Sequence, residues 1–368
     1  MADPVLDQTR SEAFAGRMMD VLNGAGITLM TSIGHQVGLF DAMADCVPAT
    51  SQQIAAAAEL NERYVREWLG VMVTGRMIDY TPTDGTYILP AEHAAWLTRA
   101  AGTDNLAVTA QFVPLLAQIE QPLIECFRNG GVPYGAFPRF QQVMADNSGT
   151  IHDAALIGTT LPLVPGLPAR LEAGIDVADI GCGSGHAVNL MARAFPNSRF
   201  VGYDFSEEGA SAGRDEAQRL GLSNARFEAR DVTRLEARDQ FDLITAFDAI
   251  HDQAQPARVL AGIAEALRPD GVFLMVDIGA SSHLHENMEF PMAPLMYTIS
   301  CMHCMTVSLA LDGTGLGAMW GEQKAREMLA DAGFTQVAVN KIDDDLTDSY
   351  YVATKEVVTG EAPSPGSV

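Results

Sequence analysis

The sequence predicts an α/β protein in which a doubly wound parallel sheet follows a mainly helical first half. From Val177 onward, short apolar runs alternate with helical patterns, as in chains of repeated βα units. The strands are expected at 177–180, 199–204, 225–230, 241–247 and 272–278. After the first of them comes a glycine-rich turn, Gly181-Cys182-Gly183-Ser184-Gly185, which is typical of nucleotide-binding βα units.

Length and charge limit the classes of function. A chain of 368 residues is long enough for two domains, and 23 basic against 47 acidic residues give a net charge of −24. That balance disfavours nucleic acids and anionic membranes as partners and favours a small-molecule substrate. No run of eighteen apolar residues occurs and the N-terminal stretch MADPVLDQTRSEAF is polar, so neither a membrane span nor a secretory signal is expected. The five scattered cysteines indicate reduced thiols and a cytoplasmic location.

The first half has the element order of a winged helix. A helix is expected over 26–44, a short one capped by Thr50 or Ser51, and another capped by Asn61. Two short strands, 77–80 and 87–89, are then joined through Asp84-Gly85.

The predicted winged helix could bind DNA or mediate dimerisation. Residues 50–80 carry three arginines against four acidic residues, which is a poor match to a phosphate backbone. The second helix of the motif also has an apolar face typical of a core: Tyr64, Val65, Trp68, Leu69 and Met72. We therefore expect a dimerisation module and a homodimer.

Composition divides the rest of the chain. The winged-helix domain is expected over 1–125 and a helical connector over 126–170. Residues 100–170 are expected to be helical, with breaks at Pro114, Pro122, Pro133 and Pro138. The sheet domain spans 171–356, closes with an antiparallel hairpin and carries an insertion at 279–320. The tail, 357–368, is expected to be disordered.

Acidic residues beside the glycine turn indicate which nucleotide is bound. A dehydrogenase turn reads G-x-G-x-x-G, but here the third glycine comes one residue early. Asp179, two positions before the turn, suits a cationic amino group better than a pyrophosphate. Asp204, at the end of the second strand, suits ribose hydroxyls, and Asp231, after the third, suits the amine of adenine.

With these residues in register, the second half resembles the class I S-adenosylmethionine (SAM) dependent methyltransferases, which have a Rossmann-like sheet. RPDGVFLMVDI and MLADAGF also resemble that family's late strand and final helix. The whole chain resembles mycobacterial winged-helix methyltransferases and small-molecule O-methyltransferases, whose first half serves dimerisation and lid formation. The resemblance implies SAM as cofactor, with the following contacts. Asp179, Gly181 and Gly183 would contact its amino-acid moiety, Gly185 would complete the turn, Asp204 would bind the ribose, Phe205, Asp231 and Val232 would surround the adenine, and Phe247 would lie beside the sulfonium.

His251 is the candidate catalytic base, between Asp248 and Asp252 at the end of the fourth strand. The related O-methyltransferases carry a catalytic histidine in a His-Asp-Trp context, whereas this chain reads His-Asp-Gln. In the alternative interpretation, His251 and Asp252 cap the helix that begins near Gln255.

The prediction is therefore methyl transfer to a small molecule, with O-methylation favoured. S-methylation of a thioether, or N-methylation, would need no base. Rivals from other classes are a SAM-responsive transcriptional regulator, which would bind DNA, and an NAD-dependent dehydrogenase, which would bind NADH.

The insertion is dense in Met, His and Cys, a composition that suits an apolar or aromatic acceptor but also a packed helical hairpin. The candidate acceptor-binding residues are Tyr134, Phe137, Met292, Met296, Tyr297, Met302 and His303. Cys301 and Cys304 form a single CxxC pair, and because structural zinc usually needs two such motifs, no metal is predicted.

Overall fold

The computed structural model describes residues 6–355 except 45, 138, 344 and 346. The predicted tail and Pro138 therefore lie outside the described residues. Contacts divide the chain into two compact units, one ending at Ala117 and one beginning at Gln118, and the second includes the predicted connector.

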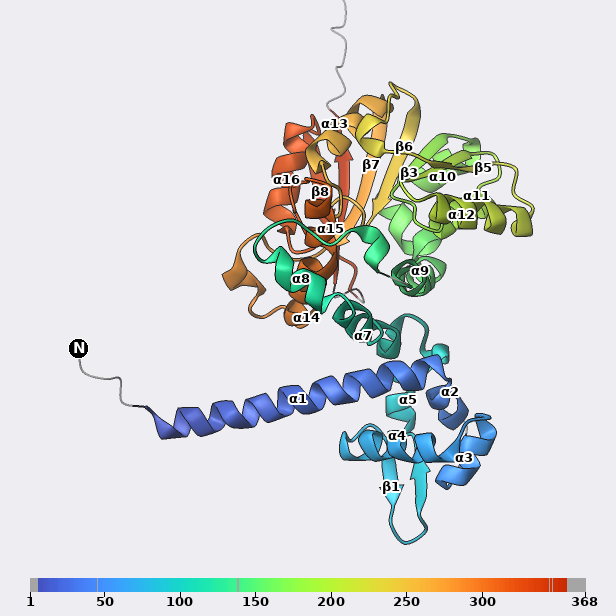
Figure 1. Ribbon diagram of the computed structural model, residues 1–368. Helices are drawn as coiled ribbons and strands as arrows, with labels where there is room; N and C mark the ends of the chain where they lie inside the picture. Colours follow the sequence, from blue (N-terminus) through green and yellow to red (C-terminus); the bar gives the residue numbers. More distant parts are fainter. Residues whose placement is uncertain (1–5, 45, 138, 344, 346, 356–368) are drawn as a thin grey trace, which may run out of the picture. The chain divides into compact units, whose positions relative to one another are not determined.

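The first unit is a winged helix (Figure 1). It contains α1 (Gln8–Gln36), α2 (Leu39–Ala44), α3 (Ser51–Ala57), α4 (Glu62–Thr74), β1 (Asp79–Thr81), β2 (Thr86–Ile88), α5 (Ala91–Leu97), α6 (Leu106–Thr109) and α7 (Phe112–Ala117). Thr50 caps α3 in a capping box with Gln53, and Asn61 caps α4, as predicted. The single helix predicted over 26–44 was wrong, because α1 begins 18 residues earlier and the chain turns at Gly38, where φ is +74°.

The face of α4 that packs inward forms the core of this unit. Val65, Leu69 and Met72 are buried, and the indole Nε1 of Trp68 donates to the Met30 carbonyl at 2.8 Å. Tyr64, predicted on the same face, is instead 78% exposed.

Two of the predicted helix breaks were wrong. Pro114 lies inside α7 and Pro122 inside α8 (Glu120–Cys126). Each proline is the third residue of its helix, where the backbone N–H has no partner within the helix and its loss is tolerated.

The second unit contains a seven-stranded sheet in the order β5-β4-β3-β6-β7-β9-β8. The strands are β3 (Asp176–Ile180), β4 (Arg199–Asp204), β5 (Ala225–Ala229), β6 (Phe241–Phe247), β7 (Leu267–Ile278), β8 (Gln336–Asn340) and β9 (Asp348–Thr354). The first five are parallel, and β9 pairs antiparallel with both β7 and β8, so the predicted closing hairpin is confirmed.

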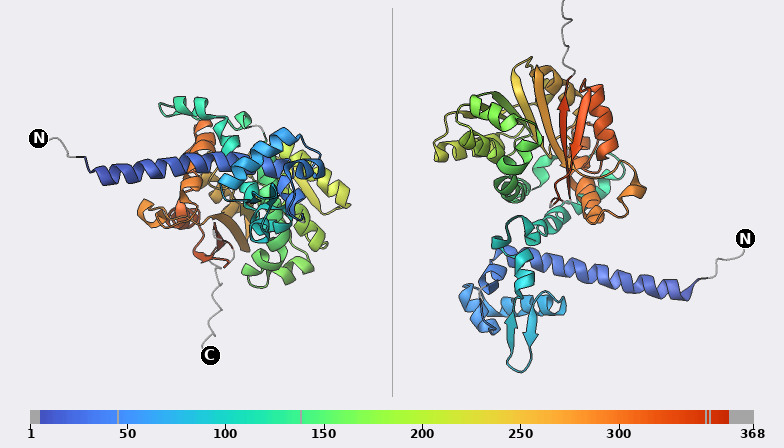
Figure 2. Two further views of the ribbon diagram at one scale, coloured as in Figure 1. Left: turned by 90° about the horizontal axis from the view of Figure 1, so that it is seen from below. Right: turned by 180° about the vertical axis from the view of Figure 1, so that it is seen from behind.

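Helices cover both faces of this sheet (Figures 1 and 2). On one face lie α10 (Leu167–Ala173), α11 (His186–Ala194) and α12 (Glu207–Leu220), and on the other α13 (Pro256–Ala266) and α16 (Gly321–Asp331). Each face has its own cluster of buried apolar side chains, as expected for a doubly wound sheet.

Two segments of the second unit include π-helical turns. One runs through α9 (Phe140–Ile151), the π-helix η3 (His152–Thr160) and η4 (Leu161–Leu163). The insertion contains η6 (Leu284–Asn287), α14 (Ala293–Ile299), the π-helix η7 (Ser300–Cys304) and α15 (Met305–Ala310). π-Helical turns are rare and occur frequently at functional sites.

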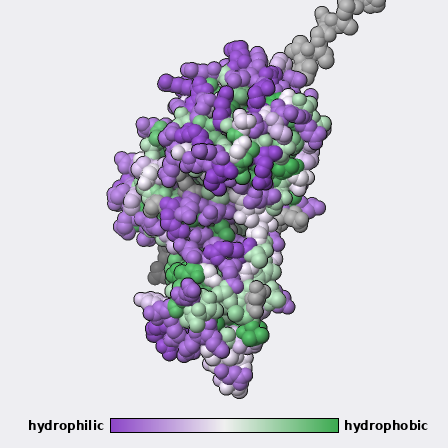
Figure 3. Space-filling view, turned by 90° about the vertical axis from the view of Figure 1, so that its right-hand side faces the viewer, coloured by the Kyte–Doolittle hydropathy of each residue, from purple (hydrophilic) through white to green (hydrophobic). Residues whose placement is uncertain are grey.

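Hydrophilic side chains cover much of the face drawn in Figure 3, in keeping with the acidic composition. Among the described residues, no single helix is long and apolar enough to cross a bilayer. Gln142–Leu163 and Leu167–Ala173 meet that criterion only as a pair, across a bend of 103°.

Candidate functional site

The candidate site lies at the carboxyl ends of the parallel strands, where doubly wound sheets bind ligands. The glycine turn leaves β3 there and is tied to the end of β4. The amides of Gly181 and Cys182 donate to the Tyr203 carbonyl at 2.8 and 3.0 Å, and that of Gly183 donates to the Asp204 carboxylate at 2.9 Å.

The three glycines of the turn have positive φ but different surroundings. A Cβ on Gly181 would lie 2.5 Å from the Cβ of Ala249, and one on Gly185 would lie 2.3 Å from the ring of Phe227. A Cβ on Gly183 would meet no atom within 4 Å. Gly181 and Gly185 are therefore required by packing, and the backbone at Gly183 borders open space that a ligand can approach.

We expect Gly185→Ala to lower the free energy of unfolding by about 2–5 kcal/mol. The left-handed backbone costs an L-residue about 1–2 kcal/mol, and overpacking against buried Phe227 adds about 1–3 kcal/mol. Gly183→Ala is the matched control, because there the new methyl group meets no atom and only the cost of the left-handed backbone remains. Urea unfolding of both variants checks this, and equal losses would contradict the packing role of Gly185.

Asp179 is a buried carboxylate at the start of the turn. Its Oδ1 accepts a hydrogen bond at 2.6 Å from the hydroxyl of Thr245, which lies on the neighbouring strand β6. Burial, partly offset by this hydrogen bond, raises the pKa of Asp179 to about 7. A cationic amino group at this position would stabilise the charged carboxylate.

Asp204 is held in place by the backbone. Its two oxygens accept from the amides of Gly183 and Ser206 at 2.9 and 2.8 Å, and each oxygen keeps lone-pair capacity for a ligand hydroxyl. The next residue, Phe205, is 60% exposed and lies edge-on to Tyr134, with ring centroids 4.9 Å apart.

The other predicted cofactor residues lie at the ends of β5 and β6. Asp231 caps a short 3₁₀ turn through its hydrogen bond to the Thr233 amide, and Val232 is buried. Phe247 is half-buried and lies edge-on to His152, with centroids 5.0 Å apart.

His251 lies at the same edge of the sheet, beyond β6. Its Nδ1 is 2.7 Å from Asp277 Oδ1, at the end of neighbouring β7, and the Trp320 indole donates to the same oxygen at 2.9 Å. Sequence reasoning missed Asp277 and Trp320, although an acidic residue at the end of a predicted strand was the available signal. The capping interpretation of His251 was wrong, since Gln255 is the N-cap of α13 and makes no side-chain cap.

The second nitrogen of His251, Nε2, lies 3.2 Å from Asp252 Oδ1. Burial lowers the pKa of His251, but Asp277 and Asp252 outweigh that effect and raise it well above its usual value. Burial conversely raises the pKa of Asp252, but His251 outweighs it and lowers that pKa to about 2. The imidazole thus lies between two carboxylates.

Asp248 occupies a strained backbone position, with φ of +50°, and its Oδ1 is buried without a hydrogen-bond partner among the described residues. Burial and the nearby Asp277 raise its pKa to about 7. One carboxylate oxygen each of Asp248 and Asp277 and one nitrogen of His251 lie within 4.8 Å of one another.

The insertion brings one predicted residue, His303, to this group. Its Nδ1 lies 3.9 Å from Asp252 Oδ2, and its ring stacks on Phe140 with centroids 3.5 Å apart. Phe137 and Tyr134 lie edge-on to the same ring, with centroids at 4.8 and 5.8 Å. The other four predicted acceptor residues are half-buried: Met292, Met296, Tyr297 and Met302. The Asn287 amide donates to the Tyr297 hydroxyl, and no hydrogen bond or ring contact among the described residues joins these four to His251.

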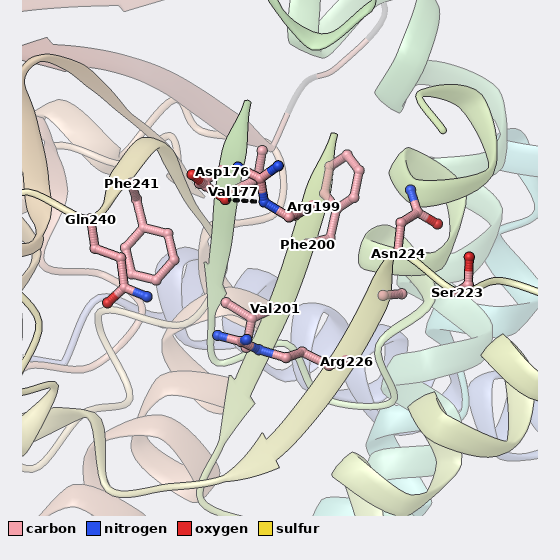
Figure 4. Close-up of a pocket in the computed structure, with 11 residues that line it drawn as sticks. Asp176, Val177, Arg199, Phe200, Val201, Ser223, Asn224, Arg226, Gln240 and Phe241 are labelled. Atoms are coloured by element: carbon pink, nitrogen blue, oxygen red, sulfur yellow. Dashed lines mark hydrogen bonds and ion pairs between the residues drawn. The ribbon is translucent and has the colours of Figure 1, made fainter. Parts of the chain in front are cut away.

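A pocket lies at the opposite, amino end of the strands, and its walls contain charged side chains (Figure 4). Asp176 and Arg199 in its wall form an ion pair at 2.7 Å, and Arg226 pairs with Glu228 at 3.5 Å. These charges pair within the protein, and the glycine turn and His251 lie at the other end of the strands.

Comparisons with known proteins agree with this geometry. Residues 25–99 match the family model described as Rv2258c-like winged HTH domain, and residues 171–337 match the one described as Methyltransferase domain. The human N-acetylserotonin methyltransferase, solved with SAM, superposes with a TM-score of 0.65 at 16% identity, covering 97% of this chain and all of that one. A mitomycin 7-O-methyltransferase gives a TM-score of 0.68 at 18% identity, covering 95% of this chain and all of that one.

Curated relatives match over part of their length. A trans-aconitate 2-methyltransferase of Variovorax paradoxus is 31% identical over 125 residues, which is 34% of this chain and 44% of the relative. The chain therefore spans less than half the length of this relative. These matches together confirm the predicted fold class, and the match over residues 171–337 identifies a methyltransferase domain.

Proposed function

We propose that this chain, a winged-helix domain followed by a SAM-dependent methyltransferase domain, methylates a hydroxyl of a small molecule with His251 as base. The observation that carries the proposal is the 2.7 Å contact between His251 and Asp277 at the carboxyl ends of adjacent strands β6 and β7. It orients an imidazole at the edge of the sheet where the glycine turn receives the cofactor.

The residues around the turn fit SAM. Open space at Gly183 admits the cofactor's amino-acid moiety, Asp179 offers a carboxylate to its amino group, and Asp204 offers lone pairs to the ribose hydroxyls. Phe205 and Val232 would pack near the adenine, with Phe247 on the sulfonium side. When bound, SAM supplies an electrophilic methyl group on sulfur.

The contribution of the protein's own residues is orientation and proton transfer. The deprotonated imidazole, with Nδ1–H donating to Asp277, would carry its lone pair on Nε2 and accept the proton of the acceptor hydroxyl. Because the two carboxylates raise the pKa of His251, this form becomes more populated as pH rises. Asp277 and Asp252 then stabilise the imidazolium, and Trp320 keeps Asp277 in place.

Charge and aromatic contacts favour a neutral or aromatic acceptor over a carboxylate. Asp252 is ionised beside Nε2, so an acidic acceptor would meet like charge there. Stacked Phe140 and His303, with Phe137 and Tyr134 edge-on, make the surroundings of Asp252 aromatic instead.

The direct test is incubation of the protein with methyl-labelled SAM and a metabolite extract, followed by mass spectrometry. We expect label on the oxygen of a neutral, ring-containing product. Thermal unfolding with S-adenosylhomocysteine (SAH) or NADH tests the cofactor separately. A larger stabilisation by NADH would refute the proposal, and label on sulfur or nitrogen would refute the role of His251 as base.

The winged-helix unit supports a proposed homodimer better than DNA binding. On α4, Arg63 pairs with Glu67 and Arg66 with Glu62, so both arginines are already engaged with acidic side chains. The long helix α1 exposes large apolar side chains along its length: Phe14, Met18, Met19, Val21, Leu22, Leu29 and Ile33. Such an exposed apolar face on one helix indicates a protein contact surface, and we propose that a second copy of this chain covers it.

Five free cysteines support a cytoplasmic location.

We expect the double variant Phe14→Glu/Leu22→Glu to elute as a monomer in size-exclusion chromatography with light scattering. Phe14 and Leu22 are 64% and 68% exposed, so the substitutions spare the core but bury charge if two copies pair here. Arg17→Glu introduces the same side chain at an exposed polar position of α1 and should leave the dimer intact. A double variant that remains dimeric would contradict this surface.

A further inference from the structure

We propose that His251, Asp252, His303 and Cys304 form a binding site for Zn²⁺ on the side of His251 facing away from Asp277. One ligand atom each from His251, Asp252 and Cys304 lies within 4.8 Å of the other two. His251 Nε2 and Asp252 Oδ1 are 3.2 Å apart. Tetrahedral zinc, with bonds of about 2.0–2.3 Å, separates its ligand atoms by roughly 3.3–3.8 Å, so small side-chain shifts would suffice.

His251 has the second-shell support typical of a metal ligand. Metal-binding histidines almost always donate their other ring N–H to a carboxylate or carbonyl, which fixes the tautomer and the ring. Here Asp277 lies 2.7 Å from Nδ1 and is itself held by the Trp320 indole, leaving Nε2 directed toward Asp252.

The independent observation is His303. Its side chain is 1% exposed, and neither ring nitrogen has a hydrogen-bond partner among the described residues. Its Nδ1 lies 3.9 Å from Asp252 Oδ2. Buried nitrogens without partners are rare in folded proteins, and a metal ion would satisfy one of these. His303 and Cys304 also lie in the π-helix η7.

The ligand atoms select the ion. Mg²⁺ and Ca²⁺ prefer oxygen ligands, whereas two imidazoles, a thiolate and one carboxylate suit zinc. Asp252 is 30% exposed at the side chain and gives an ion access to the site. This site differs from the CxxC pair considered in the sequence, because His251 and Asp252 come from the segment after β6 and Cys301 is not among the ligands.

The consequence for catalysis rests on the proposed function. Nε2 of His251 cannot both bind a metal ion and accept the acceptor's proton, so zinc should inhibit methyl transfer in competition with the acceptor. The cofactor residues on β3 and β4 are not ligands, and SAH binding should be unaffected.

The test uses Co²⁺ as a spectroscopic substitute for zinc in the full-length protein after treatment with a chelator. We expect one equivalent of Co²⁺ per chain, a thiolate-to-cobalt absorption band, and loss of that band when Zn²⁺ is added. Cys304→Ser should abolish the band, whereas Cys301→Ser should keep it. His303→Ala should weaken binding at least about tenfold.

A protein that shows no saturable cobalt band would overturn the proposal, as would a band that persists in Cys304→Ser. If Cys304→Ser does not fold, loss of zinc affinity in Asp252→Asn, measured by calorimetry, takes its place, and unchanged affinity would overturn the proposal. Thermal stabilisation by SAH, measured on the same samples, separates failure of the metal site from failure of the proposed function.

Discussion

Replacing His251 by Gln is expected to lower kcat for methyl transfer by about 10²–10⁴-fold while leaving SAH binding unchanged. Gln keeps a polar side chain of similar reach but cannot accept and release the acceptor's proton. The contact between Nδ1 and Asp277 orients the imidazole, so Asp277→Asn should lower kcat as well, through the wrong tautomer. The assay is transfer of labelled methyl from SAM to the acceptor isolated from extract.

His285→Gln is the matched control, because it makes the same change at an exposed histidine of the insertion. It should leave kcat unchanged. Full activity in His251→Gln would instead indicate an acceptor that needs no base, such as a thioether or a neutral amine. SAH stabilisation retained in every variant would show that the losses do not come from a damaged cofactor site.

The sequence predicted the sheet and the glycine turn well because their signals are local. Alternating apolar runs mark the parallel strands, and Asp179 and Asp204 follow from their positions relative to the glycines. The sequence could not show which of the three glycines are required by packing. Their difference depends on Ala249 and Phe227, which are distant in sequence.

The contacts around His251 were only half predicted, for a related reason. His251 was found from its place after a strand, but its partner Asp277 comes from the next strand and Trp320 from the residue before α16. In the sequence, Cys304 belongs to a CxxC pattern that also contains His303. Their association with Asp252 depends on tertiary packing that no local spacing encodes.

Asp179→Asn is expected to weaken SAH binding by about 1.5–3 kcal/mol, roughly 10–150-fold, and to remove its pH dependence. The amide keeps an oxygen for the Thr245 hydroxyl but loses the charge that the cofactor's amino group requires. With a pKa of about 7, Asp179 in the free protein is largely protonated below pH 7. Binding must then release that proton, so wild-type affinity should hold above pH 7 and fall up to about tenfold per pH unit below it.

The same carboxyl makes an opposite prediction for stability, which calorimetry of the cofactor-free protein can check. Because the folded state holds this proton more tightly than the unfolded chain, ionisation of Asp179 destabilises the fold as pH rises from about 4 to 7. Asp179→Asn should therefore be more stable than wild type at pH 8, by up to about 4 kcal/mol, although it binds SAH less well. Asp176→Asn, on the same strand, removes ion pairs with Arg199 and Arg268 and should lose stability while keeping the wild-type pH dependence of SAH affinity. An Asp179→Asn protein whose SAH affinity still fell below pH 7 would show that another group controls cofactor binding.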